Sequence, residues 1–294
     1  MSNNIANGNL SSVQNFTSIV HHDTYPEIAQ SDHRGKTVFI TGASRGIGRA
    51  TALAFVRAGV STIIIAARSS LETLKEELHT ISDELKLSTN IIALSLDVTS
   101  EDQIAAALTE VTQQVLSIDI LINNAGYLEQ MNPVGETDKQ GWWKAWEVNL
   151  KGIYLIVHAF LPMVLQSSSK TIINIASRGG LYTRFGASAY GGSKAAAIRF
   201  TEFLDTEYKD QGLVAIAVHP GSVLTDLALG LPQHAHSILV DTAELAADGL
   251  AWISMERREW LGGRYVSVNW DMPELISRQD EIVAGDMLKL RLVV

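Results

Sequence analysis

Short, almost continuously apolar runs alternate with longer helical stretches from Lys36 onward, and no other feature constrains the fold of this chain as strongly. Runs of this kind are typical of parallel strands that helices cover on both faces. Their alternation with helices implies right-handed crossovers. We therefore predict an α/β fold with one doubly wound, mainly parallel sheet of seven strands and helices on both faces. The strands are expected at 37–40, 61–66, 91–96, 118–122, 171–175, 214–218 and 264–268.

Helices are expected between these strands, at 46–58, 70–87, 101–116, 139–166, 189–211 and 242–255. The longest uncharged apolar run, 152–165, is shorter than the ~20 residues that a membrane-spanning helix needs, so we interpret it as a buried helix. The first basic residue is Arg34, and neither a secretory signal nor an Arg-rich transit peptide is recognisable. We expect a cytoplasmic protein without a membrane partner.

Composition excludes several classes of function. The 294 residues are 46% hydrophobic and 19% charged, which suits a chain with a substantial core. No cysteine is present, so disulfides, iron–sulfur ligation and a thiol nucleophile are excluded. The net charge of −9 argues against nucleic acid as a partner. A bound metal is not expected.

No internal repeat or linker divides the chain, so one domain with two tails is the simplest organisation. We predict an N-terminal extension over 1–33, a main catalytic domain over 34–270 and a C-terminal tail over 271–294. A substrate lid is expected at about 222–240, where Leu and Ile suit either a bulky apolar substrate or packing on the domain itself. We interpret the pair His21–His22 as part of a solvated tail rather than as a metal-binding fragment.

The first expected strand runs into a glycine-rich turn, Thr41–Gly48, and a helix follows directly. Glycines there permit a tight turn and let backbone N–H groups approach a pyrophosphate. The spacing Gly-x-x-x-Gly-x-Gly differs from the commoner Gly-x-Gly-x-x-Gly, but its place between strand and helix favours a dinucleotide site over a ligand-free turn. The candidate binding residues in the turn are Gly42, Ser44, Arg45, Gly46, Ile47 and Gly48.

Two arginines bear on which dinucleotide this turn would bind. Arg68 follows the second expected strand, where a carboxylate would favour NAD, and Arg45 lies within the turn. Guanidinium groups match a 2′-phosphate, so this pattern favours NADP (NADPH) over NAD. The alternative is that these arginines simply reach solvent.

Tyr190 and Lys194 are four residues apart in an expected helix, so their side chains share one face. An ammonium group near a phenol lowers the phenol pKa from ~10, which would make Tyr190 a usable proton donor and acceptor. Ser177 ends the fifth expected strand, at the edge where such sheets bind ligands, and can hold a carbonyl oxygen. Ser188 and Ser193 compete for that role, but neither ends a strand.

Asn149 is an uncharged polar residue in an apolar helical stretch, and a buried amide needs hydrogen-bond partners. It either makes a packing-specific hydrogen bond or holds a water in a relay to Lys194. Trp142, Trp143 and Trp146 precede it at helical spacing, which favours a core or subunit-contact role over substrate stacking.

These motifs together resemble the short-chain dehydrogenase/reductase family of the Tyr-x-x-x-Lys type, in family order over roughly residues 35–270. The resemblance implies a Rossmann-like fold and a nicotinamide cofactor. It implies that Asp97 and Val98 contact the adenine, Asn124–Gly126 the adenosine ribose region and Pro220–Thr225 the nicotinamide. The further cofactor contacts that it implies are Asn124, Ala125, Gly126, Tyr190, Lys194, Pro220, Gly221, Val223 and Thr225.

The resemblance also implies roles for the catalytic residues. Tyr190 would act as the acid in reduction and the base in oxidation, and Ser177 would bind the substrate oxygen. Lys194 would hold the nicotinamide ribose and lower the Tyr190 pKa, and Asn149 would position a water. The segment after Trp270 resembles the tails of fungal members, often from secondary metabolism.

We therefore predict an NADP-dependent ketoreductase that interconverts a ketone and a secondary alcohol on a fairly apolar small molecule. Arg178, Tyr182 and Arg184 are candidates to line its substrate pocket. Two alternatives are a cyclase, isomerase or dehydratase on the same scaffold, and a non-catalytic binding module. Members of this family usually pair through the long helices, so a homodimer or homotetramer is expected.

Overall fold

Seven strands form one sheet in the computed structural model, which describes residues 13–292. The strand order is β3-β2-β1-β4-β5-β6-β7, and every neighbouring pair is parallel. The order reverses between β1 and β4, which makes the sheet doubly wound, as predicted. The strands are β1 (Thr37–Thr41), β2 (Thr62–Ala67), β3 (Asn90–Ser95), β4 (Ile120–Asn123), β5 (Thr171–Ile175), β6 (Val214–His219) and β7 (Tyr265–Ser267).

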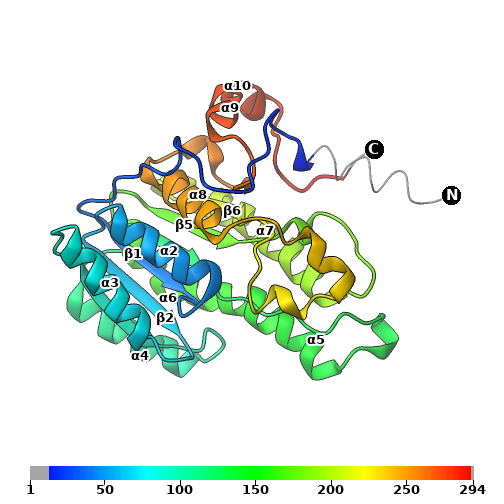
Figure 1. Ribbon diagram of the computed structural model, residues 1–294, viewed down its shortest axis with the longest axis horizontal. Helices are drawn as coiled ribbons and strands as arrows, with labels where there is room; N and C mark the ends of the chain where they lie inside the picture. The colour runs from blue at the N-terminus through cyan, green and yellow to red at the C-terminus, as the bar shows by residue number, and fades with distance from the viewer. Residues whose placement is uncertain (1–12, 293–294) are drawn as a thin grey trace.

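Helices cover both faces of the sheet (Figure 1). One buried core lies between the sheet and α2, α3 and α8, and a second lies between the sheet and α4, α6 and most of α7. The helices are α2 (Gly46–Arg57), α3 (Glu72–Glu84), α4 (Glu101–Gln114), α5 (Lys139–Trp146), α6 (Gly152–Gln166), α7 (Ser188–Tyr208), α8 (Ala243–Met255), α9 (Met272–Ser277) and α10 (Gln279–Ala284). Short 3-10 turns lie at 134–136, 178–180, 209–211, 228–230, 233–238 and 259–261.

Side-chain caps set the start of several helices. Ser100, Asp138 and Thr242 precede α4, α5 and α8, and each accepts a hydrogen bond from a backbone N–H in the first turn. Such caps satisfy N–H groups that have no partner within the helix. They explain why these helices begin within one residue of the positions that the sequence predicts.

The stretch 139–166, predicted as one helix, contains an interruption. A π-helical turn, Glu147–Lys151, separates α5 from α6. Gly152 follows it at a point where a Cβ would lie only 2.7 Å from Val98 Cγ2, so close packing requires glycine there. By length and composition the whole stretch could cross a membrane, but 56% of its most apolar window is buried in the protein, as in a core helix.

The described part of the N-terminal extension packs against the C-terminal tail, and both lie at the same end of the molecule in Figure 1. Val20 forms an antiparallel bridge with Trp270, whose indole N–H donates to the Val13 carbonyl at 2.8 Å. The interpretation of His21–His22 as part of a solvated tail is only partly met: both histidines contact the domain, although the His22 side chain is 52% exposed. His21 lies 3.0 Å from an Asp271 carboxylate oxygen, and His22 bonds to the Asp241 carboxylate.

Candidate active site

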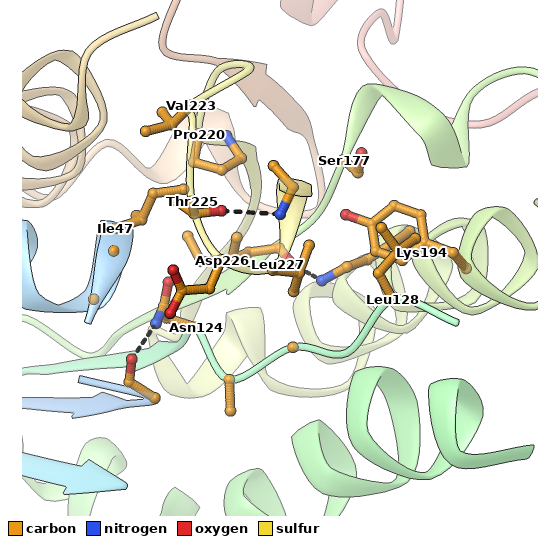
Figure 2. A pocket seen from close by; sticks show the side chains of 18 of the residues that line it. Ile47, Asn124, Leu128, Ser177, Lys194, Pro220, Val223, Thr225, Asp226 and Leu227 are labelled. Carbon is orange, nitrogen blue, oxygen red and sulfur yellow. Dashed lines mark hydrogen bonds between the residues drawn. The ribbon is translucent and has the colours of Figure 1, made fainter. Parts of the chain in front are cut away.

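A cavity of about 590 Å³ opens at the carboxyl ends of the strands and holds nearly every predicted site residue (Figure 2). This is the edge where doubly wound sheets bind ligands. Asn149 alone among those residues is not part of the lining. The predicted residues that line it are Gly42, Ser44, Arg45, Gly46, Ile47, Gly48, Arg68, Asp97, Val98, Asn124, Ala125, Gly126, Ser177, Tyr190, Lys194, Pro220, Gly221, Val223 and Thr225.

The three glycine positions of the turn do not accept larger residues. Gly42 and Gly46 have φ of +66° and +55°, the left-handed region that favours glycine. A Cβ on Gly48 would lie 2.3 Å from the Gly42 carbonyl oxygen and 2.5 Å from the Asn124 amide nitrogen. That amide donates to the carbonyls of Thr41 and Gly42 at 2.9 and 3.0 Å, which fixes the turn against the loop after β4.

We call the region around Ser44, Arg45, Arg68 and Asp97 the turn end of the cavity. Both of its arginines reach solvent with side chains 73% and 59% exposed, and each faces a carboxylate. Arg45 lies 3.0 Å from Asp226, and Arg68 lies 3.7 Å from Asp97. These exposed pairs are weak, and a bound phosphate can compete for either guanidinium.

We call the region around Ser177, Arg178, Tyr190 and Lys194 the catalytic end. Ser177 accepts a backbone hydrogen bond from Gly179 at 3.0 Å, which fixes its hydroxyl at the end of β5. Burial raises the pKa of the Tyr190 phenol, and a hydrogen bond with Ser177 opposes that rise. Negative charge on Glu129 raises the Tyr190 pKa further.

Lys194 is buried, and its Nζ donates to the Ile175 carbonyl at 2.7 Å (Figure 2). Burial lowers the pKa of this amine to about 8. The expectation that Lys194 lowers the Tyr190 pKa is not met in this structure, where the phenol pKa is raised. The reason is that Nζ lies 5.9 Å from the centre of the Tyr190 ring and is engaged by a carbonyl.

Asn149 lies in the π-helical turn, fully buried behind the cavity wall. Its Oδ1 accepts from the Tyr127 backbone N–H at 2.9 Å, and its Nδ2 donates to the Tyr127 carbonyl and to Ser193 Oγ at 2.8 and 3.1 Å. Asn149 thereby holds the loop after β4 against α7, which carries Tyr190 and Lys194. These contacts match the packing interpretation of the buried amide.

Two buried polar residues near the catalytic end were not predicted from the sequence. Glu129 is 4% exposed and accepts the backbone N–H of Tyr190 at 3.0 Å, which caps the start of α7. His219 ends β6, is 5% exposed and lines the cavity. A lone charged residue in a loop and a histidine at the end of an apolar run carry no sequence signal. Only the fold brings Glu129 to Tyr190 and places His219 in the same cavity lining as Ser177.

Known proteins with similar sequences place this chain in a family. A family model described as short chain dehydrogenase matches residues 36–235, more than half of the chain. "Short chain dehydrogenase mpl6" of Monascus purpureus is 46% identical over 285 residues, which cover 95% of this chain and 97% of that protein. This protein therefore belongs to the short-chain dehydrogenase family. It is an oxidoreductase of that family, as the sequence predicted.

Solved structures with the same fold cover most of the chain. A short-chain type dehydrogenase/reductase from Mycobacterium marinum superposes with a TM-score of 0.73 at 24% identity, over 83% of this chain and 98% of its own. A putative NAD(P) dependent gluconate 5-dehydrogenase from Beutenbergia cavernae, with bound NADP at low occupancy, has a TM-score of 0.70 at 25% identity, over 81% and 96%. The glycine turn of the present chain fits such a nicotinamide dinucleotide, because it lines the cavity at the start of α2, where backbone N–H groups can face a pyrophosphate.

Proposed function

We propose that this protein is an NADP(H)-dependent oxidoreductase that interconverts a ketone and a secondary alcohol, with Tyr190 as the acid and base. One observation carries the proposal. Ser177, Tyr190 and Lys194 line the same cavity as the glycine turn, so a dinucleotide on the turn and a carbonyl at Ser177 can share one space. The bound cofactor would supply or accept the hydride.

The chain's own residues would then position the carbonyl and move one proton. The Ser177 hydroxyl donates to the carbonyl oxygen and orients it beside the Tyr190 phenol. The raised pKa of Tyr190 keeps its proton in place at neutral pH, as reduction requires. As the oxygen gains charge, Tyr190 gives up that proton to it, and Lys194 would hold the nicotinamide ribose. Oxidation runs in reverse.

Several residues would hold the cofactor. The N–H groups at the start of α2 and the turn Gly42–Gly48 cradle the pyrophosphate, and Asp97 and Val98 border the adenine. Pro220–Thr225 would cover the nicotinamide, with Thr225 near its carboxamide. Preference for NADP is supported by Arg45 and Arg68 at the turn end and by Ala67, rather than a carboxylate, at the end of β2.

The substrate would be fairly apolar, with a secondary metabolite as the expected type. Leu128, Leu227, Leu231, Ile238 and Leu239 give the cavity lining an apolar part. Most of these come from the segment 222–240, which we propose as the lid over the main domain, 34–270. We also propose a cytoplasmic homodimer or homotetramer, which the exposure of Trp143, Tyr154 and Phe203 supports because these lie on α5, α6 and α7.

The test is hydride transfer from NADPH to a panel of aryl and aliphatic ketones, with wild-type protein compared with Tyr190→Phe. The variant should lose turnover by about 10²–10⁴-fold, the usual contribution of a positioned general acid, and should keep its affinity for NADPH. Equal rates in the two proteins would exclude Tyr190 as the acid. A matched control is Tyr208→Phe, at the far end of the same helix.

A further inference from the structure

The catalytic end of the cavity contains a cation without an anionic partner. Arg178 directly follows Ser177 and lines the cavity. Among residues 13–292, no carboxylate oxygen comes within 4.0 Å of its guanidinium. Within the part of the chain that the structure describes, its side chain makes one hydrogen bond, to Ser222 Oγ at 3.2 Å. A guanidinium has five N–H donors, so most of its hydrogen-bonding capacity is unused.

A buried histidine without partners lies beside this cation. His219 is 5% exposed and lines the cavity, and neither of its ring nitrogens has a hydrogen-bond partner in the described part of the chain. Buried polar groups normally have partners, so unpaired nitrogens on a cavity wall indicate that a ligand supplies the missing one. Burial and the charge of Arg178 lower the pKa of His219 to about 3, so the ring is neutral and offers one N–H donor.

The nearest acidic candidate is engaged elsewhere. Asp241 is buried, and its carboxylate accepts the backbone N–H of Ser222 and faces His22 Nδ1. It therefore holds the start of the lid rather than neutralising Arg178. The Ser222 hydroxyl accepts from Arg178 and keeps its own O–H free to donate into the cavity.

We propose that Arg178, His219 and Ser222 form a carboxylate-binding subsite, and that the natural substrate is a ketone that also carries a carboxylate. The inference rests on the proposed function, since it names the substrate class of the same site. One guanidinium, one neutral imidazole N–H and one hydroxyl match the two oxygens and single charge of a carboxylate. Each member of the subsite donates, and none would repel the anion.

The place of the subsite limits the shape of the substrate. Arg178 is the next residue after Ser177, and a Cβ on Gly179 would lie 3.3 Å from Ser177 Oγ and 3.6 Å from the Tyr190 ring. Glycine at position 179 thus leaves space beside Ser177 and Tyr190. A carboxylate at Arg178 fixes one end of the molecule while the ketone oxygen reaches Ser177, which restricts rotation of the substrate and hence the face presented for reduction.

The first arm of the test uses the three acetylbenzoate isomers and their methyl esters as matched pairs, with NADPH. Wild type should prefer the best acid over its ester by about tenfold or more in kcat/KM. Arg178→Gln should lower that acid-to-ester ratio by about 10–100-fold, mainly through KM, because a hydrogen bond to a charged group is lost. Arg178→Lys should keep part of the preference. Arg49→Gln, which removes a cation outside the cavity lining, should leave the ratio unchanged.

The second arm needs no turnover. Calorimetric titration of the NADP⁺-loaded protein with benzoate should show binding that Arg178→Gln weakens at least tenfold, whereas benzamide should bind both proteins equally weakly. Equal binding of benzoate and benzamide by wild type, or an acid preference that survives unchanged in Arg178→Gln, would overturn the subsite. A protein that binds benzoate through Arg178 but reduces no ketone would contradict the proposed function and leave the subsite standing.

Discussion

The two ends of the cavity use positive charge in opposite ways. At the turn end, Arg45 and Arg68 are exposed, and each faces an aspartate. At the catalytic end, Lys194 is buried and Arg178 is half-buried, and neither has a carboxylate within 4.0 Å in the described chain. An exposed ion pair contributes little to stability, about 0–1 kcal/mol, and exchanges its partner readily. A buried cation without a counter-ion costs stability, so the catalytic end is the part of the site where function opposes folding.

The largest effect in this comparison is expected from a steric change at the turn end. Gly48→Ala should weaken NADPH binding by roughly 100-fold, because the added Cβ forces the turn away from the Gly42 carbonyl and displaces the N–H groups that we propose to bind the phosphates. Fluorescence titration with NADPH measures this. Gly135→Ala is the matched control, since a Cβ there meets nothing within 4 Å. An unchanged dissociation constant in Gly48→Ala would remove the pyrophosphate from this turn.

The next effect tests whether an exposed, paired arginine can still select the cofactor. Arg68→Ala should weaken NADPH about 10–30-fold and leave NADH within about twofold, since the variant loses a charged hydrogen bond to the 2′-phosphate and only a weak pair with Asp97. Arg49→Ala serves as the control, because Arg49 also pairs with a carboxylate, Glu77, but does not line the cavity. Wild-type protein that binds NADH more tightly than NADPH would reverse the assignment.

The cost of the buried amine at the catalytic end can be measured through pH. The folded pKa of Lys194 is about 8, below its value near 10.4 in the unfolded chain. Between these values the unfolded chain holds one more proton than the native protein, so the free energy of unfolding rises with pH in this window. Without cofactor, Lys194→Met should therefore be more stable than wild type at pH 7. That advantage should shrink by about 1–3 kcal/mol toward pH 10 in urea unfolding. A stability difference independent of pH would mean that burial does not lower the pKa of Lys194.

The smallest effect concerns Glu129, a positioning residue for Tyr190. Burial and Glu129 raise the Tyr190 pKa, and Ser177 and Tyr182 are the other groups that act on it. Glu129→Gln keeps an oxygen for the Tyr190 N–H but removes the charge. The alkaline limb of kcat in the reduction direction should then move to lower pH, while the fold and the NADPH affinity stay unchanged. Glu136→Gln, exposed on the same connection, should leave the profile where it is.

Elements with a continuous apolar signal were predictable from the sequence. The strand Thr171–Ile175 has the bounds that its β-branched run predicts, and the other strands agree within two residues. Burial on both faces leaves little freedom in such segments, so local composition suffices to place them. The glycine turn, Ser177 and the pair Tyr190–Lys194 were found for a similar reason, since their spacing survives in the linear sequence.

Features that depend on long-range packing were not predictable. The π-helical turn at Glu147–Lys151 has no signal in the local sequence, and it lies where Gly152 comes close to Val98 across the fold. α9 and α10 form where the tail meets the N-terminal segment, and their lengths of six residues leave almost no periodicity to detect. The unpaired nitrogens of His219 likewise arise only where β6 ends beside Arg178.

The strap formed by residues 13–33 has a practical consequence for anyone who shortens this protein. A truncation just before Arg34 would keep every strand and every residue that we propose to bind the cofactor, so the sheet and the cofactor site would give no warning of its effect. It would nonetheless take His22 from Asp241, the carboxylate that also receives the Ser222 N–H where the lid begins. The shortened enzyme would then bind its dinucleotide normally but act on substrates differently, because the start of the lid would have lost the contact between His22 and Asp241.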